Sequence, residues 1–259
     1  MSDNQTSPNS RDWLLLIGGS TYKFTLTGFY LVALVAILKN HGYSLNQLSW
    51  IHLIGSIEAA KVLFAALMER RPAGRFGRFR GWLLAATLGL SAVFGLMACT
   101  DITQNFALLL TCCVLLSAMS AVYGCAMLGL SCIVLPHRER GFGGVIQTMA
   151  ARGGKMIGGA LVLWLYQEYG QTAAAGFMLA FSLLMLLQLL YYREPESPTA
   201  QGSWTALATR LVSFWQQPET GWRWLVLLFA VAVPYAFMAA TFVPKLADLG
   251  FNPKQTGGI

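Results

Sequence analysis

The sequence predicts an all-α, polytopic membrane protein. Of its 259 residues, 56% are hydrophobic and only 11% are charged, whereas about 25% of the residues in an average soluble domain are charged. Apolar stretches recur that are long enough to cross a hydrocarbon layer of roughly 30 Å, which takes about 20 residues as a helix. The first of these stretches is too long for the core of a signal peptide, so we expect it to remain in the membrane as a helix.

Seven apolar stretches are expected to be transmembrane helices, because a helix satisfies its own backbone hydrogen bonds within lipid. They cover residues 13–38, 45–67, 81–100, 106–134, 142–166, 173–192 and 224–243. Five cysteines lie within these spans, with no C-x-x-C pair and no His-Cys cluster. We interpret them as packing residues and expect no metal site. No dinucleotide or phosphate-binding glycine motif occurs, so no cofactor is expected.

An arginine-rich hinge between the second and third spans predicts the orientation. Arg70, Arg71, Arg75, Arg78 and Arg80 lie within eleven residues, and short loops rich in Lys and Arg are retained in the cytoplasm. With this hinge inside, eleven loop cations face the cytoplasm and three (Lys39, Lys245 and Lys254) face outward. The amino terminus is therefore predicted to be cytoplasmic. The net charge of +7 reports topology, and no nucleic-acid partner is expected.

The loop after the first span resembles a loop 208 residues later. Residues 38–47 and 246–255 each contain a glycine, an aromatic residue and a helix-capping residue three positions before a glutamine. Recurrence after six spans indicates two parallel halves. We therefore predict a six-helix bundle at 1–192, a cytoplasmic connector at 193–222 and the start of a second bundle at 223–259. We expect a fragment of a chain with about twelve spans.

Four ionisable residues are predicted at one depth in the membrane: Lys23, Glu58, Arg152 and Lys155. At about 1.5 Å per residue, Lys23 lies roughly 15 Å into the first span. A charge facing lipid costs at least about 2.5–3.5 kcal/mol, so we expect these groups to face one another or a water-filled cavity. With Lys61, the spans hold four cations and one acid. The cavity should attract a carboxylate- or phenolate-bearing solute.

The predicted binding residues are Lys23, Thr27, Tyr30, Arg152 and Lys155. The first three form one polar stripe on the first helix, and Arg152 can hold a carboxylate at two points. Glu58, the one acid within a span, is the candidate for proton coupling. Two alternatives remain open: Glu58 neutralises Lys23 or Arg152 as a fixed partner, and Lys61 reaches the lipid headgroups.

Small residues are expected to allow close helix contacts rather than to bind solute. They are Ser117 and Ser120 on the fourth helix and four glycines on the fifth, Gly153, Gly154, Gly158 and Gly159.

Charged residues at the cytoplasmic end are candidates for a gate. Glu69 with Arg70, Arg78 or Arg140 could form ion pairs that close one end of the cavity and break during a two-state change. The alternative is that these arginines only set the topology.

The hinge at Glu69-Arg70 and Gly77–Arg80 resembles the conserved loop of the major facilitator superfamily. The muropeptide-permease branch, which includes bacterial permeases for pyochelin, rhizobactin and related siderophores, is further resembled by residues 61–70, 135–143 and 246–251, and by Arg152 with the glycine pair Gly158-Gly159. The branch usually carries aspartates in its fourth helix when it transports muropeptides. The corresponding residues 123–128 contain no acid, which favours the siderophore members.

The resemblance implies a proton-coupled secondary transporter of the bacterial inner membrane that imports a ferric siderophore or a similar anionic, metal-chelating solute by alternating access. The alternatives are a muropeptide or other peptide-sugar permease, and a truncated product that transports nothing. A membrane-embedded acyltransferase is disfavoured, because the three histidines show no H-x-x-x-x-D pattern. The expected partners are an anionic small molecule, protons and the lipid bilayer.

Overall fold

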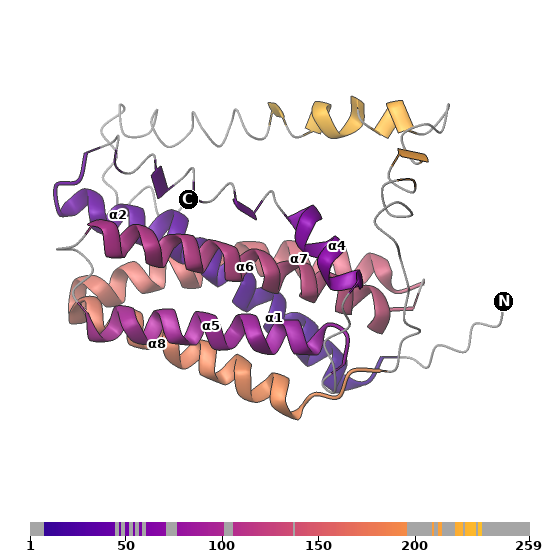
Figure 1. Cartoon of the computed structure of the whole chain (residues 1–259), viewed down its shortest axis with the longest axis horizontal. Coiled ribbons are helices and arrows are strands. Elements are labelled where there is room, and N and C mark those ends of the chain that lie inside the picture. The colour runs from indigo at the N-terminus through magenta and orange to yellow at the C-terminus, as the bar shows by residue number, and fades with distance from the viewer. Residues whose placement is uncertain are drawn as a thin grey trace. The chain divides into compact units, whose positions relative to one another are not determined.

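The structure is a computed structural model that describes residues 8–44, 47, 50–51, 54, 57–58, 61–70, 77–100, 106–136, 138–195, 209, 212–213, 221–224, 226–231 and 233–234. Its regular elements in this part of the chain are all helices (Figure 1), which confirms the predicted all-α class. The chain forms two compact units, Met1–Gln201 and Gly202–Ile259. The site lies in the first unit. The division into bundle, connector and second bundle stays a prediction.

The first span is one continuous helical stretch built from α1 (Ser10–Gly28), the π-helix η1 (Phe29–Ala33) and α2 (Leu34–Asn40). It begins at a capping box, in which the Asn9 N–H donates to Asp12 Oδ2 at 2.9 Å. This box explains why the helix starts before the predicted residue 13. Gly42 follows the helix with a positive φ of 82°, a conformation that glycine adopts without steric cost.

The capping box predicted after the first span is confirmed. Ser44 N–H donates to Gln47 Oε1 at 3.0 Å, and Gln47 N–H donates to Ser44 Oγ at 3.4 Å. The second predicted span is described only in part and ends in α4 (Lys61–Arg70). The matching loop at 246–255 lies outside the described residues.

The third and fourth spans are α5 (Arg80–Cys99) and α6 (Phe106–Val134), which match the predicted ranges to within one residue. The fifth and sixth spans are α7 (Arg140–Lys155), the π-helix η4 (Met156–Leu161) and α8 (Val162–Tyr191). Gly170 interrupts α8 with a φ of 80°, and this turn separates the two predicted spans. The seventh predicted span is described only at some positions between 221 and 234.

Four helical stretches in the described part of the chain are long and apolar enough to cross a membrane. They are Ser10–Asn40, Arg80–Cys99, Phe106–Val134 and Arg140–Tyr191, the last including the turn at Gly170. The chain is therefore multi-pass.

Helix α1 lies in the middle of the packing, against α7 and α6, while α5 packs on α8 and α6; Figure 1 shows α5 and α8 side by side. Glycines permit the closest of these contacts. A Cβ at Gly154 would lie 2.7 Å from the Thr21 carbonyl oxygen, and a Cβ at Gly158 would overlap the carbonyl oxygen of Thr25. The predicted close packing is confirmed for these two glycines. It is not found for Gly153, where an added Cβ would meet no atom of the described residues within 4 Å.

A buried chain of hydroxyl groups joins α1, α8 and α5. Tyr22 Oη lies 2.7 Å from Ser182 Oγ, which lies 2.8 Å from Ser91 Oγ. Ser91 in turn donates to the Thr87 carbonyl at 2.9 Å. The Tyr22 ring also packs edge-on against Tyr123, with the ring centroids 5.3 Å apart. These contacts satisfy polar groups inside the bundle, where an unpaired group would be costly.

Candidate functional site: a carboxylate held by three helices

The site begins with the local structure of the first span. Thr25 and Thr27 on α1 donate their hydroxyls to the carbonyls of Thr21 and Lys23, at 2.8 and 3.2 Å, as threonines in helices often do. The π-helix η1 follows directly, and a π turn adds one residue to the helical repeat. Tyr30, the second residue of η1, is buried and directs its hydroxyl toward the second span.

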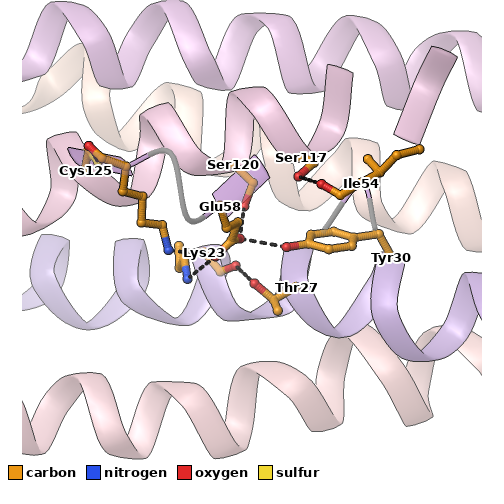
Figure 2. Close-up of polar contacts among 9 residues, drawn as sticks. Lys23, Thr27, Tyr30, Ile54, Glu58, Ser117, Ser120 and Cys125 are labelled. Atoms are coloured by element: carbon orange, nitrogen blue, oxygen red, sulfur yellow. Dashed lines mark hydrogen bonds and ion pairs between the residues drawn. The ribbon is translucent and has the colours of Figure 1, made fainter. Parts of the chain in front are cut away.

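Glu58 is the centre of the site (Figure 2). Its Oε1 accepts hydrogen bonds from Tyr30 Oη at 2.7 Å and Ser120 Oγ at 3.1 Å. Its Oε2 lies 2.7 Å from Lys61 Nζ and 3.4 Å from Lys23 Nζ. Four donors from η1, α6, α4 and α1 thus converge on one carboxylate whose side chain is 17% exposed. Such a set of partners offsets the loss of hydration of a buried charge.

Small residues on α6 hold the second span beside this cluster. Ser117 donates to the Ile54 carbonyl at 3.0 Å, and Cys125 Sγ lies 3.2 Å from the Lys61 carbonyl oxygen. At Gly124, an added Cβ would lie 3.2 Å from Lys23 Cε and 3.7 Å from Lys61 Cε. The missing side chain therefore leaves room for both lysine stems. The expected close helix contact is found at Ser117, while Ser120 contacts the acid itself.

The structure bears on the two alternatives that the sequence left open. Glu58 is paired with Lys23, one of the two partners considered for it. Lys61 also donates to Glu58, which speaks against the alternative that its ammonium group extends to the lipid headgroups. The i, i+3 spacing of Glu58 and Lys61, which brings side chains together on a helix, is a sequence signal that could have indicated this pair.

Among the predicted binding residues, the structure brings together Lys23 and Tyr30, with Thr27 buried one turn after Lys23. Arg152 and Lys155 lie on α7 with exposed side chains. Neither makes an ion pair within the described residues. Their participation in one shared chamber with Lys23 stays a prediction.

The predicted gate is described only in part. The side chains of Glu69 and Arg70 lie outside the described residues, and Arg140 is exposed. The Arg78 guanidinium lies 5.3 Å from the centroid of the Phe79 ring, a cation–π distance. An ion pair between Glu69 and any of these arginines therefore stays a prediction.

A different contact joins the ends of two spans next to this hinge. The Glu194 carboxylate accepts the N–H groups of Phe79 and Arg80, at 3.0 and 2.8 Å, and so caps the start of α5. In return, the Arg80 guanidinium donates to the carbonyls of Leu189 and Leu190, at 2.9 and 2.8 Å, near the end of α8. Sequence reasoning missed this pair, because the partners are 114 residues apart.

Buried charges within a multi-pass helical bundle are typical of proteins that provide a pathway for solutes or ions. The site indicates a protein of this class. The family model of the Major Facilitator Superfamily matches residues 15–259, and the chain belongs to this family. It is therefore a multi-pass membrane protein of the major facilitator type.

The chain is also similar to a curated protein, the anhydromuropeptide permease of Escherichia coli. It is 26% identical to the permease of strain K12 over an alignment of 256 residues that covers 97% of this chain and 51% of the relative. The same values hold for the anhydromuropeptide permease of strain O157:H7. The chain thus spans about half the length of the curated relatives it matches.

Proposed function

We propose that the protein is a proton-coupled secondary transporter that imports an anionic solute across the inner membrane by alternating access. The observation that carries this proposal is the buried cluster at Glu58, in which two lysines face one carboxylate. Two formal positive charges against one negative charge leave a surplus of one positive charge. An ionic site of this kind inside a membrane bundle favours a negatively charged ligand.

Two solute classes fit this charge. The surplus of cations and the absence of an acid at residues 123–128 support a ferric siderophore or a similar metal chelator. The matched relatives are anhydromuropeptide permeases, which supports the second class, an anhydromuropeptide, the alternative left open by the sequence. Both classes present carboxylate or phenolate groups to a cationic site, and Lys23, Arg152 and Lys155 are proposed to bind them, with Thr27 and Tyr30 beside Lys23.

Uptake measurements separate the two solute classes. A transport-deficient strain carrying the complete gene is given either a radiolabelled ferric siderophore or a radiolabelled anhydromuropeptide. Accumulation of one solute, and its loss in a Lys23→Ala variant that still inserts into the membrane, would support the proposal for that class. Accumulation of neither solute would refute it for both, and unchanged uptake by Lys23→Ala would remove Lys23 from the site.

Glu58 is proposed as the coupling carboxylate. Neutralising it in Glu58→Gln should abolish uphill accumulation while exchange of labelled for unlabelled solute continues, because exchange requires no net proton movement.

The proposed gate residues Glu69, Arg70, Arg78 and Arg140 belong to the end of the bundle that we infer to be cytoplasmic. Labelling of single cysteines introduced at 140 and at 41 with an impermeant thiol reagent in intact cells tests this orientation: only the second should react.

A further inference from the structure

The three charged side chains of the cluster differ in their exposed fractions. The side chain of Lys23 is 12% exposed, that of Glu58 is 17% exposed and that of Lys61 is 34% exposed. Lys23 therefore lies at the inner side of the cluster and Lys61 at its outer side. An ion that approaches the cluster from outside meets Lys61 first.

The Lys61 ammonium group is held in one place, and it has further donors that no described residue accepts. It donates to Glu58 Oε2 at 2.7 Å, and an ammonium group has three N–H donors. Its stem passes over Gly124, where the lack of a side chain leaves space. Its own carbonyl oxygen accepts from Cys125 Sγ at 3.2 Å, which fixes the backbone from which the lysine extends. The group is thus positioned before any ligand arrives, which reduces the cost of binding.

Charge balance identifies the kind of ligand that this position would take. Glu58 already has four donors, so it needs no further cation. The cluster still carries one positive charge in excess, since Lys23 and Lys61 share a single acid. One carboxylate or phenolate at Lys61 would bring the net charge to zero, which is the favoured state for a site with little water.

We propose that Lys61 is a further cation that contacts the anionic group of the transported solute, in addition to the binding residues proposed above, and that Glu58 is the positioning residue that holds the Lys61 ammonium group. This inference rests on the proposed transport function and adds to it a binding residue for which the sequence left the headgroups open as an alternative. Lys23, the less exposed of the two lysines, contacts the same carboxylate at 3.4 Å and helps to hold it in place.

Salicylate, which carries a carboxylate and a phenol on one ring, is a suitable probe, with salicylamide as its uncharged match. The thermal midpoint of the purified protein in detergent is measured against the concentration of each compound, because a ligand of the folded state raises the midpoint by mass action. We expect salicylate to raise it and salicylamide to have no effect. In Lys61→Gln the salicylate concentration for half of the shift should rise at least about tenfold, the loss expected when a charged partner is removed.

Two variants serve as controls. Lys61→Arg keeps the charge and should retain the salicylate shift. Lys39→Gln removes an exposed lysine at the end of α2, so it changes the net charge equally without touching the cluster, and it should also retain the shift. A Lys61→Gln protein that responds to salicylate like the wild type would overturn the proposal, as would a wild type without any salicylate response.

A second measurement needs no variant and so does not depend on the folding of Lys61→Gln. The wild-type protein is treated with an amine-acylating reagent, and the modification of each lysine is followed by peptide mass spectrometry. Saturating salicylate should slow the acylation of Lys61 about tenfold and leave that of Lys39 unchanged. An equal rate of Lys61 acylation with and without salicylate would contradict the proposal. If salicylate binding requires Lys61 but no solute is accumulated in cells, the transport function fails and the binding site stands.

Discussion

The contact between α1 and the fifth span gives the sharpest prediction about stability. A Cβ at position 158 would overlap the Thr25 carbonyl oxygen, and it would lie 2.8 Å from the Thr25 carbonyl carbon and 2.9 Å from the Phe29 nitrogen. All three are backbone atoms, so no side-chain rotation can relieve the overlap. Since carbon contacts are favourable at about 3.5–4.0 Å, Gly158→Ala must push the two helices apart.

The magnitude follows from two opposing terms. Overpacking of a tight interior costs about 1–3 kcal/mol, and a contact with rigid backbone belongs at the upper end of that range. Alanine in place of glycine within a helix returns about 1 kcal/mol. The net loss is about 2 kcal/mol, which corresponds to a fall of about 4–8 °C in the thermal midpoint for a protein of this size.

The assay is thermal unfolding of the purified variants in one detergent, followed by the loss of the monodisperse peak on size-exclusion chromatography. Gly153→Ala is the matched control, because it lies on the same helical segment and an added Cβ there meets no atom within 4 Å in the part of the chain that the structure describes. It should be as stable as the wild type or slightly more stable. Equal midpoints for Gly158→Ala and Gly153→Ala would refute the inference that this helix contact is limited by backbone.

Two further stability predictions use matched pairs. Tyr22→Phe removes the hydrogen bond to Ser182 and should cost about 1 kcal/mol. Tyr123→Phe removes a buried hydroxyl that has no partner among the described residues and should be neutral or stabilising. A lower thermal midpoint for Tyr123→Phe than for Tyr22→Phe would contradict this. Glu194→Gln weakens the cap on α5 and should cost about 0.5–2 kcal/mol, while Glu168→Gln, exposed on α8, should change the midpoint little; equal losses would show that the cap contributes nothing.

Much of the fold could be predicted from the sequence because its signals are local. The apolar run at 106–134 coincides with α6, since the length of such a run is set by the thickness of the bilayer. The capping box at Ser44 and Gln47 involves residues three positions apart. Gly158 was predicted to be a packing glycine from the sequence alone, but the same signal failed at Gly153, because it does not show which face of the helix meets a neighbour.

The candidate site could be predicted only in part. Depth along each helix follows from counting residues, so Lys23 and Glu58 were expected at one level, and the structure joins them. The rotation of each helix does not follow from counting. The π-helix that carries Tyr30 changes the direction of its side chain, and no simple periodicity in the sequence marks that change. For Lys61 the sequence left the headgroups open as an alternative, although its i, i+3 spacing from Glu58 could have indicated the pair that the structure shows.

The sequence by itself determined that the chain crosses the membrane repeatedly and that it carries more positive than negative charge inside the membrane. Composition and the length of the apolar runs determine these properties independently of how the helices pack. Only the tertiary structure decided which charges are partners. Ser120 reaches Glu58 across 62 positions and Glu194 reaches Arg80 across 114, and such distant groups become neighbours only when backbone contacts, such as that at Gly158, fix how the helices pack.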